Sequence, residues 1–155
     1  MVYKKKNISE DYSNIEEEDS RLISLMLLNK LEKTPTVYYY ELCELKNKYT
    51  PEFISKIIND ISSPYIYNGN HLHALVYLTG KLHNDLYDEE TDFYGKKSYI
   101  FENLSIYILE ELINYDIDLF CVNNANYTPL DCLFHKMCTT RTKNKKFITK
   151  LKSYY

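Results

Sequence analysis

Apolar residues recur at helical spacing along most of the chain. Four segments show it: residues 21–33, 53–61, 71–82 and 103–115. In the last of these the apolar positions are Leu104, Ile108, Leu109 and Leu112. In the second they are Phe53, Ile54, Ile57, Ile58 and Ile61. Because a spacing of three to four residues places side chains on one face of a helix, the pattern predicts an all-α protein.

Two Thr-Pro pairs in the first third of the chain mark expected helix starts. Thr50-Pro51 is followed by Glu52, which combines a capping hydroxyl, a proline where no N–H partner is lost, and an acid at the positive end of the helix dipole. Thr34-Pro35 opens a shorter segment that ends near Lys46. The run VYYYEL at 37–42 would also suit a β-strand. Since no second strand candidate lies at a hairpin distance, a helix is expected there.

The chain of 155 residues is long enough for one domain with its own core. Residues 1–19 are expected to form a flexible acidic arm, because the last ten of them hold six acids and no base. Asp19 or Ser20 is then expected to cap the first helix. Residues 20–155 form a single helical domain, in which the polar segment 84–98 is an insertion.

Two stretches of the sequence align as copies of one turn and helix start. NGNHLHAL, from Asn68, lies over NYTPLDCL, from Asn126. Asparagine is one of the few residues besides glycine that adopt the left-handed backbone conformation of tight turns. Thr34 fits the same register upstream, and removal of the insertion returns the later spacing to roughly 33 residues. The predicted units are 34–69, 70–127 and 128–155.

This pattern resembles the ankyrin-repeat family, whose helix start is Gly-x-Thr-Pro-Leu-His-x-Ala. Thr128, Pro129 and Leu130 match that motif, with Asn126 in place of glycine and Asp131 in place of histidine. The earlier copy keeps Leu72-His73 but lacks Thr-Pro. The family's histidine usually links neighbouring repeats. In the outgoing loop, Asn114-Tyr115 stands where Asn-Gly is common, and Asp116-Ile117-Asp118 stands where Ala-Asp-Val-Asn is common.

Taken together, these features resemble the divergent ankyrin proteins of poxviruses, which have an AT-rich composition, a helix opening like NGN-x-LHA and long insertions inside repeats. The chain is rich in Lys, Asn, Ile and Tyr, the residues that an AT-rich genome favours. The resemblance implies an ankyrin-repeat-like stack of helix pairs, with capping helices and one long insertion. Many members also carry a C-terminal F-box-like segment that recruits a cullin ubiquitin ligase. Because this chain ends at Tyr155, with no room for that segment, we expect a short member or a fragment.

Two groups of residues have the chemistry of metal ligands. One is His71, His73 and His83, and the other is Cys132, His135 and Cys138. A zinc site needs four converging ligands, usually in Cys-x-x-Cys knuckles, and the chain contains no Cys-x-x-Cys. A buried cysteine also behaves as a small apolar residue. Structural roles are therefore favoured and no cofactor is expected.

Other chemistry is less well supported by the sequence. The acidic loop of Asp85, Asp88, Glu89, Glu90 and Asp92 fails the calcium-loop pattern, which requires Gly at its sixth position and Glu at its twelfth. Counted from Asp88, those positions hold Phe93 and Tyr99. No nucleophile elbow or phosphate-binding loop is present. The basic stretch from Arg141 to Lys152 could attract nucleic acid, but the net charge is −3, so a nucleic-acid partner is disfavoured.

The expected function is that of a non-enzymatic protein–protein interaction module. The resemblance implies a viral host-range or immune-modulating protein that binds a host protein in the host-cell cytoplasm. We expect no small-molecule substrate and no membrane span, since no run of 18 apolar residues occurs. The candidate binding residues lie at the turns: Tyr65, Tyr67, Asn68, Asn126 and Tyr127. Alternatives are that these tyrosines only cover the stack, that the chain is a small zinc-binding or nucleic-acid-binding viral accessory protein, or that it is a non-functional fragment of a longer ankyrin gene.

Overall fold

The computed structural model describes residues 13–64, 67–79, 100–134 and 145–155, and it is all-helical. No strand occurs within these ranges, so the all-α class is confirmed for them. The helices are α1 (Ser13–Lys33), α2 (Pro35–Lys48), α3 (Pro51–Ile58), a helix at 71–79, α5 (Ile100–Asn114), α6 (Pro129–Phe134) and α7 (Lys145–Ser153). None of them is long and apolar enough to span a lipid bilayer.

Both Thr-Pro pairs begin helices, as predicted. The Thr50 hydroxyl accepts a hydrogen bond from the Phe53 N–H at 3.2 Å, which is the capping interaction expected of that residue type. Thr34 makes no side-chain cap. Its N–H instead donates to the Lys30 carbonyl at 2.7 Å, and its carbonyl accepts from the Tyr38 N–H at 3.1 Å. Thr34 therefore takes part in the backbone hydrogen bonds of both α1 and α2. The run at 37–42 lies within α2 and is helical.

Two helix boundaries differ from the sequence prediction. Helix α1 begins at Ser13, so residues 13–19 form its first turns and belong to the helix rather than to the acidic arm. Helix α3 ends at Ile58, and Ile61, the last residue of the predicted stripe, is 55% exposed. The Asn59 N–H still bonds the Ser55 carbonyl at 3.0 Å, after which the chain leaves the helix.

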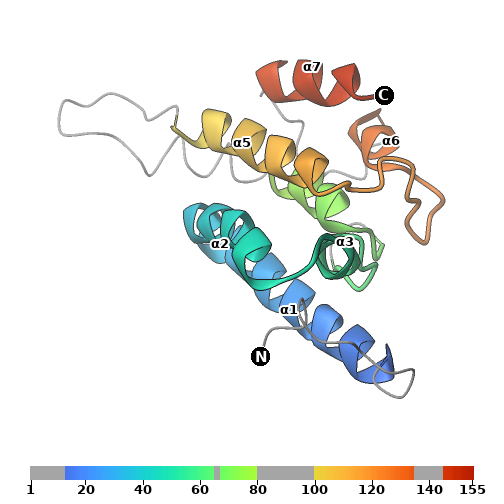
Figure 1. Cartoon of the computed structure of the whole chain (residues 1–155). Coiled ribbons are helices and arrows are strands. Elements are labelled where there is room, and N and C mark those ends of the chain that lie inside the picture. Colours follow the sequence, from blue (N-terminus) through green and yellow to red (C-terminus); the bar gives the residue numbers. More distant parts are fainter. Residues whose placement is uncertain (1–12, 65–66, 80–99, 135–144) are drawn as a thin grey trace.

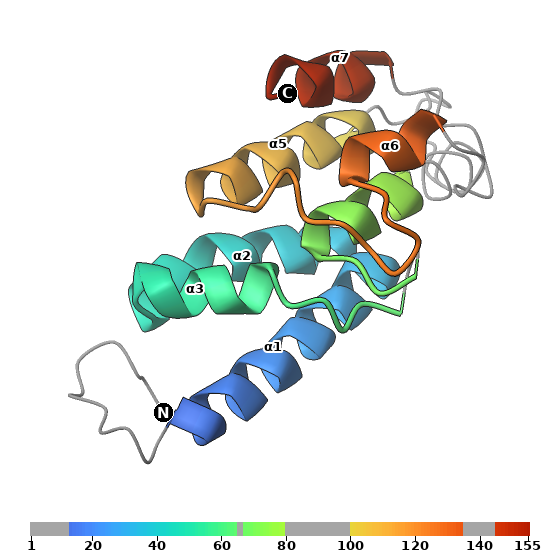
Figure 2. The same ribbon diagram turned by 90° about the vertical axis from the view of Figure 1, so that its right-hand side faces the viewer.

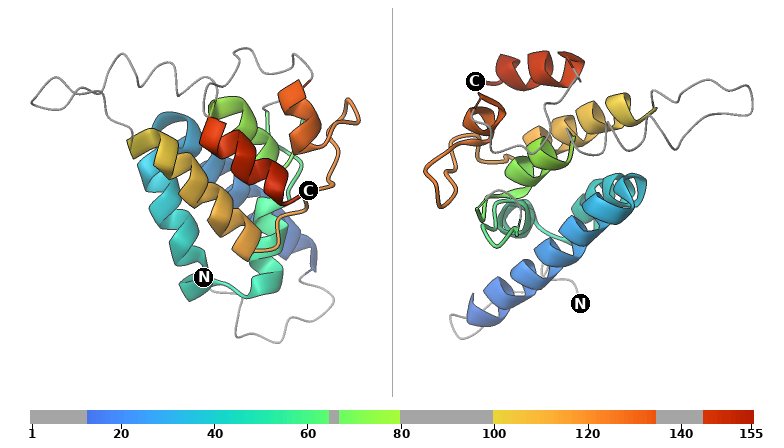
Figure 3. Two further views of the ribbon diagram at one scale, coloured as in Figure 1. Left: turned by 90° about the horizontal axis from the view of Figure 1, so that it is seen from above. Right: turned by 180° about the vertical axis from the view of Figure 1, so that it is seen from behind.

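The helices form two rows that rise from α1 to α7 (Figure 2). In one row α5 packs against α2 and α7 against α5; these three helices lie side by side when seen from above (Figure 3). The other row holds α1, the 71–79 helix and α6 (Figure 1). Helix α1 turns back into α2 at Thr34, and the Lys30 ammonium lies 2.5 Å from the Glu41 carboxylate across that hairpin.

The contacts between helices give the first repeat unit different boundaries from those predicted. Helix α2 packs mainly against α1 and α5, and only slightly against α3. Helix α3 lies in the connection between α2 and the 71–79 helix, where it packs against α1. Helices α1 and α2 therefore form the first pair, and α5 packs against both α2 and α7. The boundary expected at residue 34 falls inside the first pair, because α1 is a full member of that pair and more than a terminal cap.

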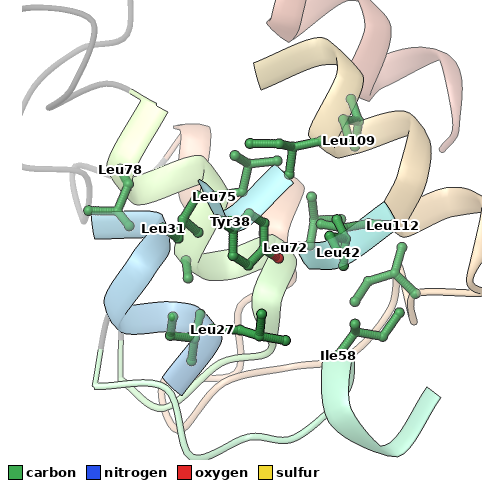
Figure 4. Close-up of a cluster of buried hydrophobic side chains, with 14 of the residues drawn as sticks. Leu27, Leu31, Tyr38, Leu42, Ile58, Leu72, Leu75, Leu78, Leu109 and Leu112 are labelled. Carbon is green, nitrogen blue, oxygen red and sulfur yellow. The ribbon is translucent and has the colours of Figure 1, made fainter. Parts of the chain in front are cut away.

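A single apolar core fills the space between the two rows (Figure 4). Leu27 and Leu31 of α1 meet Leu72, Leu75 and Leu78 of the 71–79 helix there. Leu109 and Leu112 approach the same core from α5, as the periodicity predicted. Because a single pair of helices cannot bury its apolar face alone, each pair depends on its neighbour for stability.

Candidate protein-binding surface

Two neighbouring turns carry most of the candidate binding residues. Asn68 and Asn126, the aligned asparagines, have backbone φ angles of 58° and 63°. Tyr67 and Asp116 are also left-handed, with φ of 54° and 60°. In the outgoing loop the left-handed residue is therefore Asp116. The sequence alignment instead places Tyr115, one residue earlier, where the resembling family commonly has glycine. Carboxamide and carboxylate side chains tolerate this conformation better than most.

The turn before α6 is held by one asparagine. The side-chain Oδ1 of Asn123, a residue only 4% exposed, accepts hydrogen bonds from the N–H groups of Ala125 and Tyr127, both at 3.0 Å. The Asn123 N–H donates to the Tyr127 carbonyl at 3.0 Å. The turn therefore closes on itself, which fixes the direction of the exposed residues at its tip.

Asp131 has a local role in the same segment. Its carboxylate accepts from the Thr128 N–H at 3.1 Å, while the Asp131 N–H donates to the Thr128 hydroxyl at 3.1 Å. This reciprocal pair is a capping box, which satisfies two otherwise unpaired donors at a helix start. An aspartate in place of the histidine of the resembling motif thus stabilises the start of α6.

The turn before the 71–79 helix is built differently. The Asn70 Oδ1 accepts from the N–H groups of Leu72 at 3.1 Å and His73 at 3.2 Å, so Asn70 caps the helix as threonine would. The Asn70 N–H donates to Nδ1 of His73 at 3.0 Å. A Cβ on Gly69 would lie 2.2 Å from Cγ of His73. Only glycine fits beside that imidazole.

His73 joins the two turns. Because its Nδ1 accepts a hydrogen bond, its Nε2 carries the proton and donates to the Tyr127 carbonyl at 2.9 Å. Burial lowers the pKa of His73, and the hydrogen bond to the Tyr127 carbonyl partly opposes that shift. The Asn124 N–H also donates to the Tyr67 carbonyl at 2.9 Å. The two turns are thus linked by side chain and by backbone.

Further bonds tie the outgoing loop to the preceding helices. The Asn70 amide donates to the Asp118 carbonyl at 3.0 Å, and the Asp118 N–H donates to Oδ1 of Asn59 at 2.7 Å. At the far end, the Tyr155 hydroxyl donates to the Leu119 carbonyl at 2.6 Å. The loop therefore has a defined path although it contains no regular secondary structure.

The structure brings four of the five candidate residues together. Tyr67 is 61% exposed, Asn68 and Asn126 are exposed, and Tyr127 is half-buried. Tyr65 lies outside the described residues. The linked loop adds Phe120 and Val122, which are 70% and 48% exposed and which the sequence reading did not select. We call this set the turn surface: Tyr67, Asn68, Phe120, Val122, Asn126 and Tyr127.

His71 occupies a separate, internal position. Its Nε2 lies 2.8 Å from the Ser24 hydroxyl and its Nδ1 lies 3.0 Å from the Tyr38 hydroxyl. Burial lowers the pKa of His71 to about 3, and nearby Asp60 raises it slightly. A serine beside a histidine has the geometry of an activated nucleophile, but all three side chains are completely buried. A substrate could reach Ser24 only if α1 separated from its neighbours, so the group acts as a polar link between three helices.

The candidate metal ligands do not come together in the described part of the chain. Both ring nitrogens of His71 and of His73 are engaged in hydrogen bonds with different partners. Cys132 is buried, with the Asn123 amide 3.8 Å from its sulfur. His83, His135, Cys138 and the acidic loop from Asp85 to Asp92 lie outside the described ranges. No group of three potential ligands occurs within those ranges.

Comparison with known proteins adds no relative. No family model, no curated protein and no solved structure matches this chain. The arrangement of the turn surface is that of a fixed ridge. Its backbone is held by the hydrogen bonds described above. Tyr67, Asn68, Val122 and Asn126 are exposed, the exposed Phe120 ring packs edge-on against Tyr155, and Tyr127 is half-buried against the core. Such a ridge can bind a protein with little loss of conformational entropy.

Proposed function

We propose that this chain is an ankyrin-type module that binds a partner protein through the turn surface. The observation that carries the proposal is the link from His73 to the Tyr127 carbonyl at 2.9 Å. His73 stands at the histidine position of the resembling motif, and Tyr127 immediately precedes the Thr-Pro of the next copy. A linked pair of turns in this register supports a repeat of the ankyrin type.

The exposed residues of the turn surface have the chemistry of protein interfaces. Aromatic residues are enriched there, because they supply large contact area with few rotatable bonds. Tyr67 and Phe120 are more than half exposed, and the amides of Asn68 and Asn126 lie beside them in the chain. The partner consistent with the poxvirus-type resemblance is a host protein, met in the cytoplasm, and the module acts by binding rather than by catalysis.

Site-specific photo-crosslinking tests where the partner docks. A photoreactive phenylalanine analogue placed at position 67 or 120 should form an adduct with one host protein in a cell extract. The matched control is position 40, because Tyr40 on α2 is 65% exposed and is not part of the turn surface. Equal adducts from positions 40 and 67 would contradict the proposed surface.

Alanine substitution tests whether the same residues contribute binding energy. The variant Tyr67→Ala with Phe120→Ala should weaken capture of the crosslinked protein by roughly tenfold or more, the effect of losing central aromatic anchors. The matched variant Tyr40→Ala with Tyr107→Ala should leave capture unchanged; Tyr107 is 52% exposed on α5. If the Tyr40→Ala, Tyr107→Ala variant captured the partner more weakly than the Tyr67→Ala, Phe120→Ala variant, the interface would lie on α2 and α5 instead.

A further inference from the structure

A hollow lined by α5 and α7 has a different character from the turn surface. It lies between α5 and α7 and has a volume of about 530 Å³. Its lining is one apolar residue and five polar ones: Ile106, Lys145, Lys146, Thr149, Lys150 and Ser153. Ile106 comes from α5, and every other lining residue comes from α7. We call it the lysine groove.

The lysine groove is positive in a chain whose net charge is negative. No acidic residue occurs between residues 141 and 155. Among the described residues, the Glu110 carboxylate lies 3.7 Å from the Lys150 ammonium. Lys145 and Lys146 are exposed, and neither has an ion-pair partner among the described residues. Two of the three lysines are thus exposed and have no carboxylate partner within the part of the chain that the structure describes.

The position of these two lysines is unfavourable for the helix itself. Lys145 and Lys146 occupy the first turn of α7, which contains no acid. The start of a helix carries a partial positive charge, so cations there destabilise it and anions stabilise it. Residues that oppose local stability without a structural gain are frequent at functional sites. A bound anion would offset both the lysine charges and the helix dipole.

We propose that the lysine groove binds an acidic segment of a partner protein, with an apolar side chain of that segment on Ile106. This site is separate from the turn surface and does not depend on it. Lysine ammonium groups are point charges without the planar fork by which arginine grips a single phosphate. Three of them spread along an open groove suit several carboxylates in a row. The hydroxyl of Thr149 can bond a peptide backbone, and the apolar side chain of Ile106 can contact an apolar side chain of the peptide.

Nucleic acid is the less favoured polyanion for this groove. Single strands are held by exposed aromatic side chains that stack on the bases, beside a basic track. The rings of Tyr154 and Phe134 each lie close to a lysine of α7, at 5.6 Å from Lys150 and 5.3 Å from Lys152. Neither ring is among the residues that line the groove. The negative net charge also opposes long-range attraction of a polyphosphate.

Fluorescence anisotropy with the full chain tests the proposal. The probe is a labelled short peptide in which glutamates surround a single leucine, used at an ionic strength of about 0.15 M. The double variant Lys145→Gln, Lys146→Gln should weaken its binding by roughly tenfold. The matched control, Lys33→Gln with Lys48→Gln, removes the same charge from exposed lysines of α1 and α2 and should change binding less than twofold.

Two further measurements complete the test. A peptide with glutamine at every glutamate position should not bind, and a labelled oligonucleotide should bind more weakly than the acidic peptide at the same salt concentration. The Lys145→Gln, Lys146→Gln variant should unfold at the same temperature as the parent or a higher one, since α7 loses an unfavourable charge pair. The proposal is overturned by no binding of the acidic peptide, by equal losses in the two lysine variants, or by tighter binding of the oligonucleotide.

Discussion

His73 donates from Nε2 to the carbonyl oxygen of Tyr127 across 2.9 Å and 54 residues of sequence. The same imidazole accepts the Asn70 N–H through Nδ1. One buried side chain therefore sets the spacing between two turns that carry Tyr67, Asn68 and Asn126. The conformation of the turn surface depends on a residue that is not itself exposed.

Replacement of His73 by alanine should destabilise the fold by about 2 to 4 kcal/mol, because it leaves the buried Asn70 N–H without its imidazole acceptor and removes one of the two donors to the Tyr127 carbonyl. The free energy of unfolding from urea titration measures this. His73→Ala should also weaken partner capture although the turn-surface side chains are unchanged. A loss of stability below about 0.5 kcal/mol, the range of ordinary surface substitutions, would show that the link is unimportant.

Gly69→Ala should destabilise the protein by about 1 to 3 kcal/mol, the usual cost of forcing atoms into a packed site. The new methyl group would lie 2.2 Å from Cγ and 2.4 Å from Cβ of His73, and that side chain is fixed by hydrogen bonds at both nitrogens. A double-mutant cycle provides the check. In a His73→Ala background Gly69→Ala should cost much less, and additive costs would contradict the proposed clash.

At each of the two left-handed asparagines, Asn68 and Asn126, substitution by glycine and substitution by valine should have different effects on stability. Asn126→Gly should be neutral or slightly stabilising, since glycine has no Cβ penalty at a φ of 63°. Asn126→Val should cost roughly 1 to 2 kcal/mol, because a β-branched side chain disfavours this conformation. Thermal unfolding of the two variants beside Asn68→Gly and Asn68→Val measures both effects. If valine at both positions left the unfolding temperature unchanged, the left-handed backbone conformation of these two residues would be contradicted.

The free energy of unfolding should fall as the pH is lowered, because His71 and His73 are more easily protonated in the unfolded chain than in the folded protein. Each has a pKa lowered by burial in the folded state, so the unfolded chain binds more protons at acidic pH. The stability from the neutral rings is fully present above the unfolded pKa of about 6.5. It is lost as the pH falls through the folded pKa, which is about 3 for His71. Each ring contributes a slope of up to about 1.4 kcal/mol per pH unit in that window.

Histidine proton resonances provide the check on this pH dependence. In the folded protein the His71 ring signals should not titrate between pH 7 and the onset of acid unfolding, whereas a histidine in an unfolded chain titrates near 6.5. The variant His71→Gln should show a shallower loss of stability on acidification. A His71 signal that titrated in the folded protein near neutral pH would contradict its burial between Ser24 and Tyr38.

Much of the local structure follows from the sequence. Thr50-Pro51 begins α3 with the predicted cap, and the stripe from Phe53 to Ile58 is buried as its spacing indicated. The aligned Asn68 and Asn126 share one backbone conformation. These features depend on residues within one or two turns of each other, so the sequence alone carries the necessary information. Helix ends are less certain, as Ser13 and Ile61 show, because the last hydrogen bonds of a helix compete with tertiary contacts.

The candidate site could be predicted only in part. The turns and their tyrosines were recognisable from the aligned asparagines, but Phe120 and Val122 lie in a segment with no periodic pattern. Their alternation, at positions two apart, was the only signal, and it does not distinguish an exposed loop from a short strand. The lysines of the groove were visible as a basic stretch, whereas the hollow beside Ile106 exists only where α5 meets α7.

The sequence by itself determined the helical class, the helix starts at Thr34 and Thr50, and the left-handed turns, because capping, proline geometry and residue spacing act over a few residues. Only the tertiary structure decided which helices pair. Tyr38 reaches His71 across 33 residues and Ser24 reaches the same ring across 47, and these contacts place α1 within the stack. Contacts over such distances depend on how whole helix faces fit together, and no local pattern specifies that fit.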